Sequence, residues 1–221
     1  MKHILTILLL GGLAFAQSKT ATKTGTASKA APAAAHAPAV YRVKLTTTKG
    51  DVVVEITRAW APLGADRFYQ LVRSGFFTGA PFFRVIPNFM CQFGISPTPA
   101  VNKTWEARRL PDDPKPYQSN KRGTLTFATT GQPNSRGTQL FINYKDNTFL
   151  DSQGFAPIGQ VVEGMEIAEQ FYSGYGDTAS KEGEIENGGQ AYLDRNMPHV
   201  DKIIRATIVP APPKPAAEAK Q

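Results

Sequence analysis

The residues best placed to do chemistry lie in one stretch, residues 82–94, which reads Phe-Phe-Arg-Val-Ile-Pro-Asn-Phe-Met-Cys-Gln-Phe-Gly. Aromatic and β-branched residues on both sides of Pro87-Asn88 predict two short strands joined by a turn. Each strand carries one strongly polar side chain, Arg84 on the first and Gln92 on the second. A guanidinium and an amide on otherwise apolar strands are costly to bury without partners. They are therefore either half-exposed surface groups or two members of a polar site.

Strand alternation predicts which side chains accompany this pair, because successive side chains of a strand point to opposite faces. Arg84 is expected to share a face with Phe82 and Ile86. On the second strand, Gln92 is expected to share a face with Met90. One side of the strand pair would thus combine polar and large apolar side chains.

Residues able to act as nucleophile, general base or metal ligand are scarce elsewhere in the sequence. Cys91 is the only cysteine, so no intramolecular disulfide can form, and its place on the strand predicts a buried thiol. Of the three histidines, His3, His36 and His199, only the last is expected in the folded domain. This excludes a His-clustered metal site and a Ser-His-Asp or Cys-His triad in the core. We expect chemistry that needs no metal, no cofactor and no proton shuttle.

The elements that must position these residues follow from hydrophobic patterning. Residues 41–47 and 51–56 alternate around Lys49-Gly50 and predict a β-hairpin. Pro62 predicts the start of a helix that ends at Ser74-Gly75, and residues 165–171 predict a second, short helix. Further strands are predicted at 123–129, 139–143, 156–162 and 203–209, and a long surface loop at 95–122. Many short strands with only two good helices favour a mainly β, closed antiparallel barrel capped by helices.

The two ends of the chain differ in composition from the part between them. Residues 1–16 have a basic start, a run of about ten apolar residues and a small-x-small end, typical of a secretory signal peptide cleaved after Ala16. Residues 17–39 and 210–221 are rich in Ala, Lys and Pro and predict a disordered linker and tail around a domain at 40–209. We expect an exported protein, periplasmic or secreted, that does not span a membrane and is a monomer by default.

The positive charge belongs mostly to these ends. Six of the 25 Lys and Arg residues and one of the 18 acidic residues lie in the signal, linker and tail, which leaves the domain a net charge of +2. A sequence isoelectric point near 9.5 therefore does not indicate a nucleic-acid partner.

Arg84, followed by Ile86-Pro87, Phe89-Met90 and Gln92, resembles the active-site strand pair of the cyclophilins, the peptidyl-prolyl cis-trans isomerases. Later segments extend the resemblance over roughly residues 41 to 209. These segments are Phe127-Ala128-Thr129, residues 137–141, Phe149-Leu150-Asp151 and residues 154–159. The resemblance implies a closed eight-stranded antiparallel β-barrel capped by two α-helices.

The resemblance also implies an isomerase acting on Pro-containing segments of unfolded or exported proteins. Arg84 would hydrogen-bond to the prolyl nitrogen of the twisted amide, and Gln92 would orient Arg84 and hold carbonyl groups. Phe89, Met90, Phe141 and Leu150 would form the pocket for the proline ring. The full set of implied substrate-binding residues is Phe89, Met90, Ala128, Thr129, Gln139, Phe141, Phe149, Leu150 and Phe155.

Three positions depart from the family pattern. Thr129 stands where many members carry Asn, but its backbone can still pair with a substrate. Phe149 stands where cyclosporin-sensitive members carry Trp, and Phe155 where eukaryotic members carry His. These two changes remove polar groups, so we expect weak cyclosporin binding.

The segment at residues 173–200 is longer than in compact eukaryotic cyclophilins. Its Tyr175-Gly176-Asp177 and residues 187–193 resemble a bacterial extracytoplasmic branch of the family. No individual residue of this segment is assigned a role by the resemblance.

A non-catalytic role is the alternative interpretation. A cyclophilin-shaped chaperone or scaffold could hold Pro-containing segments without isomerising them. Retention of Arg84, Phe89, Met90, Gln92 and Phe141 favours the enzyme, because a scaffold needs no such set.

Overall fold

The structure is a computed structural model that describes residues 36–115 and 118–210. Eight strands form one antiparallel sheet in the order β3-β4-β6-β5-β7-β2-β1-β8. They are β1 (Val40–Thr47), β2 (Asp51–Thr57), β3 (Arg84–Ile86), β4 (Met90–Phe93), β5 (Thr124–Phe127), β6 (Leu140–Asn143), β7 (Pro157–Glu163) and β8 (Ile203–Val209). The prediction of a mainly β fold with eight antiparallel strands is confirmed.

The sheet curls into a barrel whose edge strands, β3 and β8, are not paired with each other. The residues just before β3 and β8 connect the two edges of the sheet, since Pro81 and Lys202 form an isolated antiparallel bridge. Beside it, the N–H of Phe82 donates to the carbonyl of Asp201 at 2.8 Å. The prediction of a closed barrel is therefore slightly too strong, since a short bridge takes the place of a strand pair.

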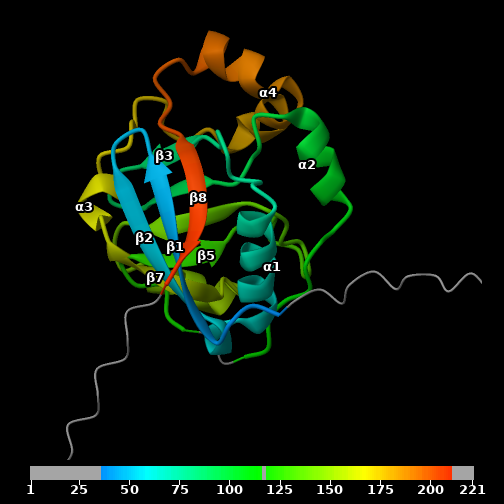
Figure 1. The fold of residues 1–221 in the computed structure, drawn as a ribbon, viewed down its shortest axis with the longest axis vertical. Coiled ribbons are helices and arrows are strands. Elements are labelled where there is room, and N and C mark those ends of the chain that lie inside the picture. The colour runs from blue at the N-terminus through cyan, green and yellow to red at the C-terminus, as the bar shows by residue number, and fades with distance from the viewer. Residues whose placement is uncertain (1–35, 116–117, 211–221) are drawn as a thin grey trace, which may run out of the picture. The chain divides into compact units, whose positions relative to one another are not determined.

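Helices flank the barrel in greater number than the sequence predicted (Figure 1). The helix α1 (Pro62–Arg73) has its predicted bounds, and α3 (Met165–Ala168) is a single turn. Two more helices, α2 (Pro99–Glu106) and α4 (Glu182–Asn196), pack against each other, with Asn102 of α2 donating to the carbonyl of Glu186. Short 3₁₀ helices span Arg58–Trp60, Thr148–Gln153 and Ala179–Lys181.

The prediction of a featureless loop at 95–122 is wrong over α2. Pro99 lies at the start of α2, where its missing N–H leaves no helical hydrogen bond unmade. The helix α4 was not predicted because Gly188-Gly189 weakens the helical pattern in its middle. Gly189 has a φ of 56°, and a Cβ there would lie 2.4 Å from the carbonyl oxygen of Pro97, so α4 is kinked at a position that requires glycine.

The main core fills the barrel with the inward faces of the strands and the buried faces of α1 and α3. Phe82 belongs to this core and stacks on Phe171 with ring centroids 3.9 Å apart. The prediction that Phe82 shares a face with Arg84 is therefore wrong, because β3 begins only at Arg84 and alternation does not extend to Phe82. Cys91 is fully buried as predicted, and burial raises the pKa of its thiol to about 12.

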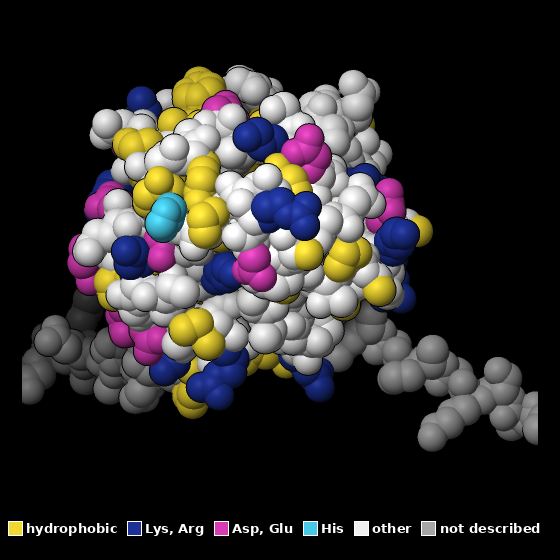
Figure 2. Space-filling view, turned by 90° about the horizontal axis from the view of Figure 1, so that it is seen from above, with side chains coloured by type: hydrophobic (Ala, Val, Ile, Leu, Met, Phe, Trp, Pro, Cys, Tyr) yellow, Lys and Arg dark blue, Asp and Glu magenta, His cyan; other side chains and the backbone are white. Residues whose placement is uncertain are grey.

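The predicted signal peptide, most of the linker and residues 211–221 of the tail lie outside the described residues. His36 and Ala37, which we assigned to the linker, already contact the domain through Asp66. The contacts of the domain therefore extend at least to His36, four residues before the predicted boundary at Val40. One face of the domain shows acidic and basic side chains interspersed rather than a field of one sign (Figure 2).

A buried ion pair fastens the start of α1 to the loop that precedes β6. Asp113 accepts hydrogen bonds from the backbone N–H groups of Leu63 at 2.6 Å and Gly64 at 3.0 Å. The guanidinium of Arg136 donates to the same carboxylate at 2.6 Å, and both side chains are almost inaccessible to solvent. Removal of one partner leaves a buried charge uncompensated.

We expect Asp113→Ala to lower the free energy of unfolding by about 3 kcal/mol. The substitution removes the carboxylate that compensates the charge of Arg136 and accepts from two backbone N–H groups of the helix. Urea unfolding measures the change. The neighbouring Asp112→Ala is the matched control, since this carboxylate is 41% exposed and 4.0 Å from Arg136. Its cost should stay below about 1 kcal/mol, and equal losses in the two variants would contradict the role given to the buried pair.

Candidate functional site

Strand register brings the two polar residues of β3 and β4 together. Arg84 is paired with Gln92 between these strands, and Gln92 with Phe141 between β4 and β6. Directly opposed residues of an antiparallel pair point to the same face. These three side chains therefore form a row on the outer face of the barrel, while the next residues along, such as Val85 and Cys91, fill its core.

Beside this row lies an apolar cluster that is separate from the main core. Its buried members are Met90, Phe141 and Leu150, with exposed fractions between 2% and 6%. Ile86, Phe89, Ala128 and Phe155 pack around them. We refer to these seven residues as the outer cluster. The outer cluster therefore lies on the face of these strands opposite the barrel core.

Aromatic contacts shape the wall of the outer cluster. Phe155 meets Phe141 edge to face, with ring centroids 5.7 Å apart. Phe149 stacks on Phe89 at 6.2 Å and is 54% exposed, so it forms the rim rather than the floor. The sequence-predicted apolar residues are thus brought together, with Phe149 at the solvent edge.

Buried amides hold the 3₁₀ helix that carries Phe149 and Leu150. The side chain of Asn147 donates to the carbonyl of Phe89 at 2.8 Å. Asp151 accepts from the hydroxyl of Ser119 at 2.6 Å and from the backbone N–H of Asn120 at 2.8 Å. Burial alone would raise the pKa of Asp151, but these hydrogen bonds outweigh it and lower the pKa below its ordinary value.

A chain of amide hydrogen bonds leads away from Arg84. Its Nη1 donates to Oε1 of Gln92 at 3.0 Å. The Nε2 of Gln92 donates to Gln139 at 2.7 Å, and the Nε2 of Gln139 donates to a carboxylate oxygen of Glu182 at 3.1 Å. Each amide therefore has its oxygen and nitrogen fixed, which locks the acceptor that faces Arg84.

The opposite edge of the guanidinium is held by a carboxylate. The Nε of Arg84 donates to Oδ1 of Asp177 at 2.7 Å, and its Nη2 donates to Oδ2 at 3.0 Å. The hydrogen bonds from Arg84, and a weaker one from the backbone N–H of Ala179, hold the pKa of Asp177 below its ordinary value. Arg84 thus lies between an amide and a carboxylate, with its side chain 21% exposed.

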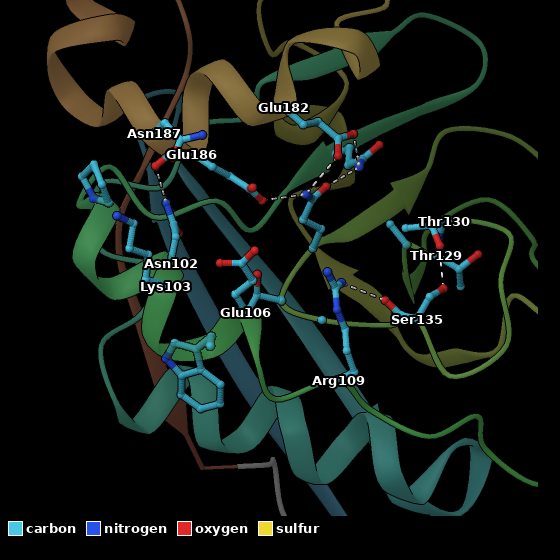
Figure 3. A pocket seen from close by; sticks show the side chains of 17 residues that line it. Asn102, Lys103, Glu106, Arg109, Thr129, Thr130, Ser135, Glu182, Glu186 and Asn187 are labelled. Carbon is cyan, nitrogen blue, oxygen red and sulfur yellow. Dashed lines mark hydrogen bonds between the residues drawn. The ribbon is translucent and has the colours of Figure 1, made fainter.

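A cavity of about 190 Å³ adjoins Gln92 and lies between α2, α4 and the strands (Figure 3). Its lining includes Gln92, Ala128, Thr129 and Gln139, and the charged residues Lys103, Glu106, Arg109, Glu182 and Glu186. Burial raises the pKa of Glu186, the hydrogen bond from Gln139 opposes this, and the charges of Glu182 and Glu106 add to it. Since Ala128 belongs to both places, the cavity and the outer cluster share a wall.

The sequence analysis predicted most of these site residues. It did not predict the residues from other elements that hydrogen-bond to them. Ile86 was identified in the motif without a site role, and it packs on the outer cluster. Asp177, Glu182 and Glu186 were not assigned to the site at all. The Tyr175-Gly176-Asp177 sequence was the available signal for the first of them, but nothing local indicates that it reaches Arg84.

Metal and membrane features are not found in the described part of the chain. No group of three or more His, Cys, Asp or Glu side chains within residues 36–115 and 118–210 could hold a metal ion. Over the same residues, no helix is both long and apolar enough to cross a bilayer.

Comparisons with known proteins all indicate the same family. The family model described as cyclophilin type peptidyl-prolyl cis-trans isomerase/CLD matches residues 42–189. The chain is 36% identical over 141 residues to a peptidyl-prolyl cis-trans isomerase of Acinetobacter baylyi, covering 62% of this chain and 74% of the relative. It is 34% identical over 168 residues to a probable peptidyl-prolyl cis-trans isomerase of Brucella abortus, covering 72% and 78%.

Among solved structures, the fold resembles a cyclophilin type peptidyl-prolyl cis-trans isomerase of Cryptosporidium parvum. The TM-score is 0.59 at 22% sequence identity, over 78% of this chain and 99% of that one. At this identity the likeness concerns the fold alone.

Proposed function

The chain belongs to the cyclophilin-type peptidyl-prolyl cis-trans isomerases, and from this membership we propose that it accelerates rotation about X-Pro bonds in exported polypeptides, with Arg84 as the catalytic residue. The observation that carries the proposal is the position of Arg84, which donates a hydrogen bond to Gln92 and lies in the same cross-strand row as Phe141 of the outer cluster.

The reaction sets the requirements for the site. Rotation about the prolyl amide faces a barrier of about 18–20 kcal/mol, because the bond is conjugated. Twisting the bond breaks the conjugation and leaves a lone pair on the prolyl nitrogen. A catalyst therefore needs a hydrogen-bond donor aimed at that nitrogen and a dry pocket that fixes the ring. It needs neither a nucleophile nor a general base.

Arg84 meets the first requirement. Guanidinium groups remain charged across the physiological pH range, so the donor is always available. A hydrogen bond to the prolyl nitrogen forms only when the lone pair appears, so it stabilises the transition state more than the ground state. Gln92 assists by holding Nη1 and thereby the plane of the group.

The outer cluster meets the second requirement. Met90, Phe141 and Leu150 would form the floor for the proline ring, and Phe89 and Phe155 its walls. The thioether of methionine adapts to the shape of the ring. The backbone at Thr129 would pair with the substrate chain, and Ala128 and Gln139 would line its path toward the neighbouring cavity.

We expect Arg84→Ala to lower kcat/KM by about 100-fold or more, because it removes the donor that acts in the transition state. Arg84→Lys should be nearly as damaging, since an ammonium keeps the charge but lacks the planar fork that Gln92 holds. A protease-coupled assay on a proline-containing peptide measures both. A wild type as slow as Arg84→Ala would instead favour a proline-binding scaffold. Activity within twofold of wild type in Arg84→Lys would contradict the geometric role.

Export is proposed from the N-terminal sequence, whose basic start and apolar run are typical of a signal peptide. We expect the full chain produced in a Gram-negative host to be recovered from the periplasm with Gln17 as its first residue. Mass spectrometry of the intact protein measures this. Replacement of Leu8 and Leu9 by Arg should keep the unprocessed chain in the cytoplasm, and an intact Met1 in the periplasmic protein would contradict cleavage at this site.

Phe149 is expected to weaken cyclosporin-type inhibitors without affecting turnover, because it supplies an exposed ring without an indole N–H. One hydrogen bond lost opposite a buried carbonyl costs roughly 1–3 kcal/mol, about one to two decades in affinity. Phe149→Trp should therefore raise affinity at least tenfold and change turnover less than threefold. Phe149→Leu is the control, and unchanged affinity in the Trp variant would turn attention to Phe155.

A further inference from the structure

The segment that contains Asp177 is fastened directly to the strand that carries Arg84. Thr178 is 2% exposed, and its hydroxyl donates to the backbone carbonyl of Phe83 at 2.6 Å. Phe83 immediately precedes Arg84 in the chain. The residue after Asp177 is thus tied to the residue before Arg84, so the carboxylate and the guanidinium are brought together by backbone anchors as well as by their charges.

The carboxylate is also fixed on its own side. Oδ1 of Asp177 accepts the backbone N–H of Ala179 at 3.1 Å in addition to the Nε of Arg84. Because the carboxylate of Asp177 is already held by a backbone N–H of its own turn, it loses little further conformational entropy when it pairs with Arg84. This distinguishes the contact from a surface ion pair between two long, mobile side chains, which contributes little.

The hydrogen bonds of Arg84 leave part of its fork free. A guanidinium has five N–H groups in one plane. Two of them, on Nε and Nη2, point to Asp177, and one on Nη1 points to Gln92. One N–H therefore remains on each of the two terminal nitrogens. With an acceptor on both edges, the plane of the group and the direction of these free donors are set before a substrate arrives.

We propose that Asp177 is a positioning residue for the isomerase reaction, which holds the guanidinium of Arg84 so that its free N–H groups face the prolyl nitrogen. The inference rests on the proposed role of Arg84. Asp177 itself contacts no substrate in this scheme and acts through Arg84 alone. The 173–200 segment thereby contributes to catalysis, although it lies outside the strands that form the outer cluster.

The test compares Asp177→Ala and Asp177→Asn with the wild type in the full chain, using the protease-coupled peptide assay. For Asp177→Ala we expect kcat to fall about 10-fold with KM changed less than twofold, because misorientation of a catalytic group affects the transition state. Asp177→Asn should lie between, since its amide keeps one acceptor and loses the other. The control is Glu184→Ala, an exposed carboxylate of the same segment that accepts from Tyr192 and should leave kcat unchanged.

Two further measurements separate positioning from a merely structural effect. In an Arg84→Ala background, Asp177→Ala should lower the rate less than twofold further, because its target is gone. By NMR, the Nε–H of Arg84 should exchange slowly with water in the wild type and in Glu184→Ala, and rapidly in Asp177→Ala.

The possible failures are distinguishable. Unchanged or raised kcat in Asp177→Ala, with Arg84→Ala inactive, overturns the positioning role and leaves the proposed function standing. A raised kcat would mark Asp177 as a competitor for Arg84. Full activity of Arg84→Ala overturns both the proposed function and this inference. Equal losses from Asp177→Ala with and without Arg84 also overturn it, because they indicate a structural effect.

Discussion

The site depends on the register of β3, β4 and β6. Arg84 opposite Gln92, and Gln92 opposite Phe141, place a guanidinium, the amide that it hydrogen-bonds and an aromatic ring of the outer cluster in a single row. Alternation sends the intervening residues, such as Cys91, into the barrel. A slip of one residue would exchange the two sets, burying a guanidinium and exposing the core. The barrel therefore stabilises the site because both use the same pairing, and neither can change register without the other.

The parts that the sequence predicted are those encoded by local pattern. Period-two alternation and the Pro87-Asn88 turn indicate the β3–β4 hairpin, and Asn88 has the positive φ of 58° that such a turn needs. The prediction of which side chains share a face of these strands was wrong only for Phe82. This residue precedes the start of β3, and its side chain packs into the core. The resemblance to a known family indicated site residues that hydrophobic patterning alone could not identify. Six of these residues meet in the outer cluster: Phe89, Met90, Ala128, Phe141, Leu150 and Phe155.

The parts that the sequence missed are set by contacts between distant segments. Asp177 lies 93 positions from Arg84, and Glu182 lies 90 positions from Gln92. No spacing rule links such residues, because a long loop can return to the barrel at many places. The helix α4 was not predicted for a different reason. Gly189 breaks its regular geometry so that the backbone can approach Pro97, and this local irregularity makes sense only once the partner is known.

The outer cluster and the barrel core share strands but have no side chain in common. A substitution at Phe155 or Phe149 therefore alters the shape offered to a ligand while the packing of residues such as Cys91 and Ile142 stays as it was. Under the proposed function, substitutions at these outward-facing positions would change ligand recognition while leaving the barrel core intact. A designer who wishes to retune specificity would start from those outward-facing positions.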